Sequence, residues 1–387
     1  MIDRRTFLKF SGRGVLLVSG LSLLSSCSGV RREDLSRLNG NQVSIARLSK
    51  DEIEILHLAS LAPSGHNTQP WSVKVLEPGL WVIGTDPKRW LPAVDPENRE
   101  IFLGIGAFLE NLVISAGNFG YKVNLEVLAK STKDLEIARI RLQKGKTEEI
   151  PLEKIRKRRT VRNGLLNDPI KKEDLAYITK HGTQSCSVSS ISPFFLKTHA
   201  FYFPQDAREG KYLQEGTIEA NRTQAFRDPA QRELSNWIRW SNEDARKYRN
   251  GLTPASMEIE GIAGWYVRNF YDQNSVLKKG FRDQTVEMVV KQVKAGSGWL
   301  VVTAPDSSIP TLLAYGMVWQ NMVLKIRDRL IAIHPMTQLL EEEPYKKQVA
   351  KDLGLTGEIQ WIARIGYVRS YPDPVSLRMP VSWFLQG

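Results

Sequence analysis

The chain has 387 residues, of which 42% are hydrophobic and 25% charged, a globular mixture that excludes a disordered protein. Its 54 Lys and Arg residues outnumber its 42 Asp and Glu residues, which gives a net charge of +12. Such a charge suits nucleic acid, an anionic membrane surface or a phosphorylated ligand, and alone it selects none of them. Two cysteines are too few for a disulfide framework.

The first residues have the pattern of an export signal. Arg4 and Arg5 precede an apolar run at 14–24, which is too short to span a bilayer, and small residues then precede Cys27. A short packed helix is the structural alternative. The Arg pair resembles a twin-arginine signal and Leu-Ser-Ser-Cys resembles a lipobox. We therefore expect residues 1–26 to be removed, Cys27 to be lipidated, and the folded protein to be anchored on the periplasmic side of a bacterial membrane.

A polar segment at 27–49 is interpreted as a tether, and the periodic pattern begins at Lys50. The first predicted elements are a helix from Lys50 that stops at Pro63, strands at 71–75 and 80–83, a helix at 101–119 and a strand at 135–142. The later ones are a helix at 174–181, a strand at 201–203, one long helix at 209–248, a mixed stretch at 251–279, a strand at 299–303, a helix at 311–333 and a strand at 359–368.

One internal similarity stands out. The helical sequence from Gly106 to Asn111 has the same Gly-to-Asn spacing as that from Gly316 to Asn321, and each follows a strand that starts with Gly. A chance match between two helices is the alternative. Taken with the chain length, the similarity predicts two related halves, at 50–150 and 151–387.

Several kinds of chemistry find no motif in this sequence. The five histidines lie at least nine residues apart and no Cys cluster accompanies them, so we predict no metal site. The sequence also lacks a P-loop, a nucleophile elbow and a Rossmann fingerprint.

The loop at 62–71 is unusually polar. Between Pro63 and Pro70 it carries Ser, His, Asn, Thr and Gln within six positions, whereas an ordinary turn needs one or two such residues. A planar heterocycle with ring nitrogens and carbonyls would use these donors and acceptors. An elaborate structural loop is the alternative.

The sequence at 156–162, RKRRTVR, is the densest basic run. Guanidiniums at alternate positions, together with the Thr160 hydroxyl, can hold a terminal phosphate through charge-assisted hydrogen bonds. Arg378, after the last predicted strand, could close that pocket. A solvated basic face is the alternative. Nucleic acid is disfavoured because the basic residues are dispersed along the chain.

Both segments resemble a known family. The sequence at 63–71, PSGHNTQPW, resembles the Pro-Ser-x-x-Asn-x-Gln-Pro-Trp signature of the nitroreductase family of FMN-binding oxidoreductases. The sequence at 158–162 resembles the Arg-x-Ser-x-Arg/Lys element that binds the flavin phosphate in that family. The order of the two segments resembles the fused, double-length branch called Acg-like. The resemblance implies an α+β fold in which the two halves form an intramolecular pseudo-dimer around antiparallel-rich mixed sheets flanked by helices, with 251–265 as a lid.

The resemblance also implies one FMN per chain. Its predicted contacts in the polar loop are Ser64, Gly65, His66, Asn67, Gln69 and Trp71. Its predicted contacts in the basic run and the C-terminal segment are Arg158, Arg159, Thr160, Arg162 and Arg378. No catalytic residue is named, because the flavin itself carries the redox chemistry.

Three functions follow as alternatives. The first is an exported FMN-dependent oxidoreductase whose electron donor is a membrane quinol or a partner reductase, since little NAD(P)H is present outside the cytoplasm. The second is a flavin store that keeps its FMN under the lid. The third is a basic extracytoplasmic binding protein without flavin. The small-molecule acceptor is not defined by the sequence.

Overall fold

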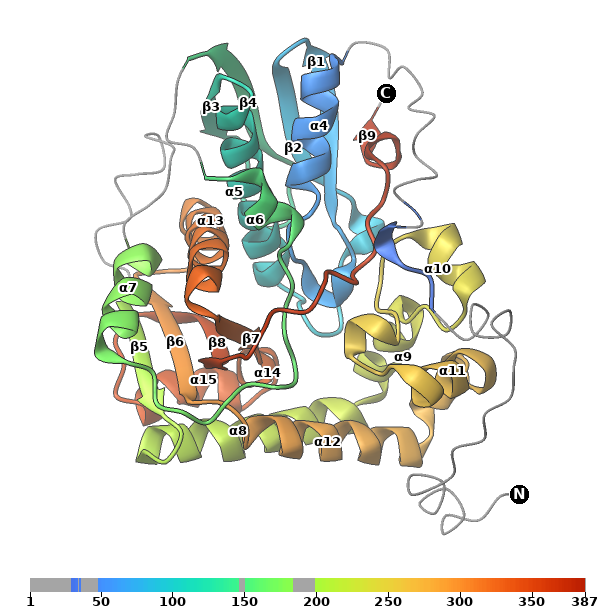
Figure 1. Cartoon of the computed structure of the whole chain (residues 1–387), viewed down its shortest axis with the longest axis vertical. Coiled ribbons are helices and arrows are strands. Elements are labelled where there is room, and N and C mark those ends of the chain that lie inside the picture. Colours follow the sequence, from blue (N-terminus) through green and yellow to red (C-terminus); the bar gives the residue numbers. More distant parts are fainter. Residues whose placement is uncertain (1–28, 34, 36–47, 146–149, 184–198, 387) are drawn as a thin grey trace.

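The structure is a computed structural model that describes residues 29–33, 35, 48–145, 150–183 and 199–386. The predicted signal at 1–26, the predicted lipidation site Cys27 and most of the predicted tether at 27–49 lie outside the described residues. Two separate sheets form the body, and helices flank each of them (Figure 1). The α+β class expected from the sequence is confirmed.

The two sheets are built almost entirely from antiparallel pairs. The first has the strand order β3-β4-β2-β1-β9 and the second the order β5-β6-β8-β7, and the pairing of β1 with β9 is parallel. The strands of the first sheet are β1 (Trp71–Glu77), β2 (Leu80–Thr85), β3 (Tyr121–Val127), β4 (Glu136–Lys144) and β9 (Leu385–Gln386). Those of the second are β5 (His199–Pro204), β6 (Gly298–Ala304), β7 (Ile331–Pro335) and β8 (Glu358–Tyr367).

Two long helices, α5 and α13, lie between the sheets, and α8 and α12 run side by side along one end of the molecule (Figure 1). The helices before residue 200 are α4 (Lys50–Ala59), α5 (Arg99–Asn118), α6 (Leu152–Arg156) and α7 (Lys172–Thr183). The later ones are α8 (Arg208–Phe226), α9 (Asp228–Trp237), α10 (Asn242–Tyr248), α11 (Gly261–Phe270), α12 (Lys279–Val293), α13 (Ile309–Ile326), α14 (Gln338–Glu341) and α15 (Tyr345–Asp352).

The helices α5 and α13 cross at the two glycines of the internal similarity. A Cβ added to Gly106 would collide with the carbonyl oxygen of Leu313, and one added to Gly316 would collide with that of Leu103. Glycine at both positions lets the two backbones approach closely, and the helices then bury their apolar side chains in one core.

The polar pairs of this crossing are reciprocal. Gln320 Nε2 donates to Asn111 Oδ1 at 2.8 Å, and Asn321 Nδ2 donates to Glu110 Oε1 at 2.6 Å. In the internal similarity, position 110 corresponds to 320 and position 111 to 321, so the first position of each helix contacts the second position of the other. Such an exchange accords with a twofold arrangement of the two helices. The division of the chain into two related halves stays a prediction.

Helix α5 passes the length and composition test for a membrane span among the described residues, but 94% of its apolar window is buried inside the protein. Its packing against α13 and the first sheet accounts for that burial. It is therefore a core helix.

Two predicted helices were wrong in extent. The single helix predicted at 209–248 is three helices, because the chain is extended at Arg227 before Pro229 enters the first turn of α9, and Ser241 caps α10. The helix predicted at 311–333 ends at Ile326, and the apolar residues from Ile331 form strand β7 instead.

Both ends of the described chain pack on the body. Leu35 is buried against Ala245 and Leu377, so this part of the predicted tether at 27–49 is folded and not free. At the other end, Leu385 pairs with Val73 of β1, so the C-terminus of the predicted second half joins the sheet of the first. The C-terminal segment thereby passes beside the polar loop.

Candidate functional site

The polar loop (residues 62–71) connects α4 to β1 through a strained backbone. His66, Asn67 and Gln69 have φ values of 45°, 54° and 55°, in the left-handed region that side chains disfavour. The Ser64 hydroxyl accepts a hydrogen bond from the Gln69 backbone at 3.0 Å, which closes the loop on itself. Such strain persists only where the surroundings hold it, and it is common at functional sites.

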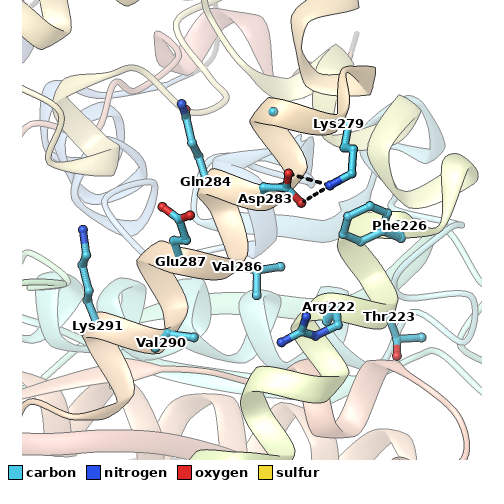
Figure 2. A pocket seen from close by; sticks show the side chains of 11 residues that line it. Arg222, Thr223, Phe226, Lys279, Asp283, Gln284, Val286, Glu287, Val290 and Lys291 are labelled. Carbon is cyan, nitrogen blue, oxygen red and sulfur yellow. Dashed lines mark hydrogen bonds and ion pairs between the residues drawn. The ribbon is translucent and has the colours of Figure 1, made fainter. Parts of the chain in front are cut away.

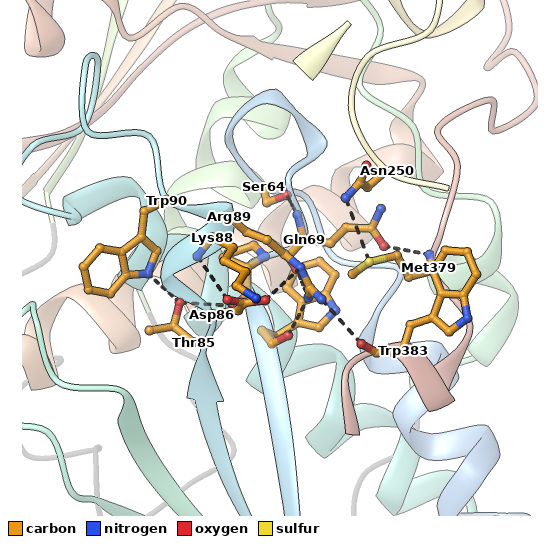
Figure 3. A network of polar contacts seen from close by, with 12 residues as sticks. Ser64, Gln69, Thr85, Asp86, Lys88, Arg89, Trp90, Asn250, Met379 and Trp383 are labelled. Atoms are coloured by element: carbon orange, nitrogen blue, oxygen red, sulfur yellow. Dashed lines mark hydrogen bonds and ion pairs between the residues drawn. The ribbon is translucent and has the colours of Figure 1, made fainter. Parts of the chain in front are cut away.

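The two amide side chains of the loop bind other segments of the protein. Asn67 Nδ2 donates to the carbonyl oxygens of Gly251 at 3.0 Å and Leu377 at 3.2 Å. Gln69 Nε2 donates to the Arg249 carbonyl at 3.0 Å, and Gln69 Oε1 accepts from the Met379 backbone at 3.0 Å (Figure 3). These bonds fix the loop against the C-terminal segment, so the predicted flavin contacts of both amides compete with contacts inside the protein.

Arg378, predicted to contact the phosphate, makes several hydrogen bonds within the protein. Its guanidinium donates to Asn67 Oδ1 at 2.7 Å and to the carbonyl oxygens of Leu61 at 3.1 Å and Ala62 at 2.9 Å. A guanidinium has five N–H donors in a fixed fork, and most of them are used here. Arg378 therefore ties the C-terminal segment to the polar loop.

Gly65 and Trp71 also serve the packing of the loop. A Cβ at Gly65 would lie 2.9 Å from Leu91 Cδ1, so a side chain there would require Leu91 to shift. Trp71 is fully buried in the core, with its ring centroid 5.2 Å from that of Phe108. A direct cofactor contact by the Trp71 ring is not supported, because its apolar neighbours enclose it.

Among the described residues, the basic strip (residues 156–162) contains a buried cation with no anion beside it. Arg158 is 9% exposed, its Nε has no hydrogen-bond partner in this part of the chain, and its side chain donates to Thr160 Oγ1 at 3.4 Å. Burial and the neighbouring guanidiniums, first that of Arg32 and then that of Arg162, lower the pKa of Arg158 to about 10. Buried charges are normally paired, so an anionic ligand is the partner that this side chain lacks.

The other arginines of the strip are held differently. Arg159 forms an ion pair with Glu258 at 3.4 Å and donates to the Asp373 carbonyl at 2.6 Å, so it is a structural residue. The Arg162 backbone is fixed at both ends: its N–H donates to Glu258 at 3.0 Å and its carbonyl accepts from Arg364 Nη2 at 2.7 Å. Within the described residues, no hydrogen bond engages the Arg162 guanidinium.

His66 of the polar loop lies within electrostatic range of Arg162 in the basic strip. Burial, and then the positive charge of Arg162, lower the pKa of His66 to about 4. The imidazole is therefore neutral at pH 7, and its buried Nδ1 has no hydrogen-bond partner among the described residues. A neutral ring nitrogen beside an Arg can exchange a hydrogen bond with a polar ligand.

Three residues in or near this basic region, Arg32, His334 and Arg364, were not predicted as site residues from the sequence. Arg32 precedes the first long helix, while His334 of β7 and Arg364 of β8 hydrogen-bond to each other at 2.8 Å. Burial and the Arg364 charge lower the pKa of His334, so it adds no positive charge.

A covering segment (residues 251–260) bridges the polar loop and the basic strip. At one end the Gly251 N–H donates to the Asn67 carbonyl at 2.9 Å, while the Gly251 carbonyl accepts from the Asn67 side chain. At the other end, the Glu258 carboxylate accepts from the backbone N–H groups of Arg162 at 3.0 Å and Asn163 at 2.8 Å. The first part of the predicted lid at 251–265 therefore spans the region where a ligand would lie.

The last part of the predicted lid lies elsewhere. Residues 261–265 begin helix α11, and Ile262 and Trp265 are exposed instead of covering the site.

The structure also has two surface cavities. One, of about 1220 Å³, is a groove between α8 and α12, with the ion pair of Lys279 and Asp283 along its α12 side (Figure 2). The other, of about 1370 Å³, is lined by residues that include Trp90, Trp237 and Arg239. Neither is lined by a residue of the polar loop or the basic strip, and among the described residues no group of three His, Cys, Asp or Glu side chains could hold a metal ion.

The family model described as "Nitroreductase family" matches residues 155–367, more than half of the chain. The chain belongs to the nitroreductase family. The basic strip, the covering segment and strands β5 to β8 all lie within, or begin at the edge of, the matched residues, whereas the polar loop precedes them.

Relatives in this family include two proteins of Mycobacterium tuberculosis named as NAD(P)H nitroreductases. Rv3131 is 35% identical over 71 residues, which are 18% of this chain and 20% of that protein. The protein acg is 34% identical over 85 residues, or 22% and 25% of the two chains. The similarity to acg accords with the Acg-like branch expected from the sequence. The chain spans no more than a quarter of the length of these curated relatives.

Solved nitroreductase structures show loose similarity. FMN-dependent NfnB of Mycobacterium smegmatis, in complex with NADPH, is 15% identical with a TM-score of 0.36, covering 57% of this chain and 92% of that one. A nitroreductase of Bacteroides fragilis with bound FMN is 14% identical with a TM-score of 0.34, covering 59% and 94%. A nitroreductase-type protein of Anabaena variabilis is 11% identical with a TM-score of 0.35, covering 95% and 97%.

Proposed function

We propose that this chain is an exported, FMN-dependent oxidoreductase of nitroreductase type, anchored to the membrane by a lipid on Cys27. The observation that carries the FMN proposal is the buried Arg158 guanidinium, which has no anion beside it among the residues that the structure describes. Membership of the nitroreductase family and the FMN named in two solved relatives support it. The twin-arginine and lipobox patterns support the export proposal.

The residues of the site fit FMN as follows. Arg158 and Arg162, with the Thr160 hydroxyl, would hold the phosphate through charge-assisted hydrogen bonds. Arg364 positions Arg162 by donating a hydrogen bond to its carbonyl oxygen. The neutral His66 offers a ring nitrogen to the ribityl or ring atoms, while Arg378 keeps Asn67 in place.

When bound, FMN would supply the two-electron redox chemistry. The protein's own contribution is then binding, orientation and the exclusion of water under the covering segment. The surplus of positive charge around Arg158 and Arg162 would favour an anionic cofactor over a neutral one. The electron donor proposed here is a membrane quinol or a partner reductase, and the acceptor is an undefined small molecule.

A second candidate function is a flavin store. The covering segment is fixed at both ends, by Gly251 to the polar loop and by Glu258 to the basic strip. A segment held in this way would restrict the access of a second substrate to the cofactor. Storage and turnover thus predict the same binding site with different rates of electron transfer.

The purified protein is expected to bind FMN and to bind riboflavin, which lacks the phosphate, at least a hundredfold more weakly. Absorption spectra and fluorescence titrations with both compounds measure this difference, which follows from the loss of the charge-assisted bonds to the phosphate. If the protein stays colourless after incubation with FMN and removal of the unbound FMN, both flavin-dependent functions are excluded. The remaining function is that of a basic binding protein without flavin. Dithionite reduction followed by quinones and nitroaromatics then separates the remaining two functions: rapid reoxidation indicates an enzyme, and none indicates a store.

The Glu258→Gln substitution is expected to speed the release of FMN at least tenfold. It removes the negative charge that accepts the two backbone N–H bonds and pairs with Arg159, so the covering segment should open more often. Stopped-flow release into excess apoflavodoxin, or another flavin acceptor, measures the rate. The matched control is Glu260→Gln, two residues away and exposed; equal release rates in the two variants would remove the latch role of Glu258.

A further inference from the structure

Helix α11 presents an unusual apolar stripe to the outside. Ile262 is 88% exposed, Trp265 37%, Tyr266 44% and Phe270 60%. These positions are i, i+3, i+4 and i+8 of one helix, so they share one face. The rings of Trp265 and Tyr266 lie 5.6 Å and 4.8 Å from that of Phe270, which makes the stripe continuous.

The opposite face of α11 is packed on the body. Gly264 is buried, and a Cβ there would collide with the Ile259 carbonyl. Val267 packs on a cluster that includes Ile238, Trp240 and Val276. This packing fixes the orientation of the helix, so its apolar stripe faces outward in the folded protein. Large exposed apolar groups in such a cluster mark an interaction site.

The described chain begins beside this helix. A Cβ at Gly29 would lie 3.2 Å from Arg268 Nη1, on α11, and the Val30 N–H donates to Asn242 Oδ1 of α10 at 3.0 Å. The predicted lipidation site, Cys27, is two residues before Gly29 in the sequence. Two residues of extended chain span about 7 Å at most, so a lipid on Cys27 would enter the bilayer close to α11.

We infer that α11 lies in the interface of an anionic phospholipid bilayer, with its aromatic stripe buried among the headgroups and upper acyl chains. Trp and Tyr favour this depth because their rings are apolar and their N–H and O–H groups stay hydrated. After position 26 the chain has 50 Lys and Arg residues and 41 Asp and Glu residues, and this surplus of positive charge adds attraction to anionic lipids. A lipid chain and an amphipathic helix together supply the two signals that firm membrane attachment requires.

This inference rests on the lipid attachment proposed above, and it places one side of the molecule on the membrane. Helix α11 follows the covering segment directly, since it begins at the residue after Glu260. The side that faces the bilayer is then the side that carries the covering segment. This arrangement would bring the proposed FMN site near a membrane-soluble electron donor.

The test uses the full chain with Cys27→Ser, which removes the lipid and isolates the helix. Co-sedimentation with vesicles of phosphatidylcholine and phosphatidylglycerol is expected to show binding that the further double substitution Ile262→Ser/Phe270→Ser weakens at least tenfold. The matched control is Leu76→Ser/Leu135→Ser, which removes two other exposed apolar side chains and should bind as before. Brominated phospholipids should quench a fluorescence component that Trp265→Phe abolishes.

Three outcomes would overturn the inference. Equal vesicle binding with and without the Ile262 and Phe270 substitutions would assign any binding to other parts of the chain, such as the apolar run at 14–24. Absence of binding by the Cys27→Ser protein would show that α11 does not enter the interface. A change of oligomeric state in the double variant, with vesicle binding unchanged, would assign the stripe to a second copy of the chain. Mass spectrometry of the parent protein, which keeps Cys27, tests separately whether the lipid is attached. Failure of the lipid proposal and failure of the α11 inference are therefore distinguishable.

Discussion

Replacing Arg158 and Arg162 together by Ala is expected to weaken FMN binding by a factor of about 100 to 10,000. Each lost charge-assisted hydrogen bond to the phosphate costs about 1.5–3 kcal/mol, so two of them cost about 3–6 kcal/mol. Arg158 contributes most clearly, because its guanidinium is buried beside a hydroxyl and near three other guanidiniums, and no carboxylate of the described residues pairs with it. Quenching of FMN fluorescence during a titration measures the dissociation constant.

The basic strip contains its own control for this experiment. Arg156 lies in the same run and forms an ion pair with Glu54 at 2.8 Å on the surface, so Arg156→Ala should leave FMN affinity within about twofold of the parent protein. Riboflavin should bind the double variant and the parent equally well, since it has no phosphate to lose. If the double variant keeps the parent's affinity for FMN, the phosphate site is not at Arg158 and Arg162.

The folding of the double variant can be checked without the cofactor. An uncompensated buried cation destabilises the folded apoprotein, so removing Arg158 should not lower the urea midpoint of the apo form. Loss of FMN affinity with an unchanged or higher midpoint then reports binding alone. A lower midpoint for the apoprotein would instead give Arg158 a structural role.

Local signals predicted well the elements around the site. Pro63 and Pro70 bracket the polar loop, and the strand that follows has the β-branched and aromatic residues expected of it. The Gly106 and Gly316 similarity predicted a pair of related helices, and the structure shows their crossing at those glycines, where no side chain fits. In each case the deciding interaction lies within the segment or at one repeated position.

Other features depended on contacts between distant segments. The Glu258 carboxylate accepts hydrogen bonds from backbone N–H groups almost a hundred residues earlier in the chain, and nothing in the neighbouring sequence distinguishes it from the other acidic residues. The phosphate contact of Arg378 stays a prediction from its charge, and its bonds to the carbonyl oxygens of Leu61 and Ala62 were not predicted. Residue type gives a donor or a charge, whereas its partner is decided by the tertiary fold.

The helix stops that were missed have the same origin. The charge pattern at 209–248 does not favour three helices over one. The one local signal is Pro229, because a proline ring is tolerated in the first turn of a helix and not in its interior. The apolar residues at 331–333 continue the periodicity of the preceding helix, yet they complete the second sheet beside β8. Pairing with a strand more than thirty residues later outweighed the local pattern.

The Glu110→Gln substitution is expected to stabilise the protein at pH 8 by up to about 3 kcal/mol. Glu110 is fully buried at the crossing of α5 and α13, and burial raises its pKa to about 7, while Asn321 and then Lys325 act in the opposite direction. One carboxyl oxygen accepts from Asn321 and the other has no partner among the described residues. A raised acid pKa means that the folded state holds a proton which the unfolded state releases near pH 4.5.

The sign of the pH dependence follows from that difference. The contribution of Glu110 to stability is favourable below about pH 4.5, falls as the pH rises towards 7, and is fully lost above 7, where the folded protein must bury a charge. A shift from 4.5 to about 7 corresponds to about 3 kcal/mol. Gln cannot ionise and keeps the carbonyl oxygen that Asn321 needs, and Gln320 already stands at the exchanged position of α13.

Urea denaturation at pH 5 and pH 8 measures the effect as the difference between variant and parent, so that the titration of all other groups cancels. The free energy of unfolding of Glu110→Gln should exceed that of the parent protein at pH 8 and approach it at pH 5. Glu215→Gln, an exposed substitution on α8, should show no such change between the two pH values. Parallel curves for Glu110→Gln and the parent would mean that Glu110 stays ionised in the folded protein, and the polar pairs between α5 and α13 would then include a buried charge.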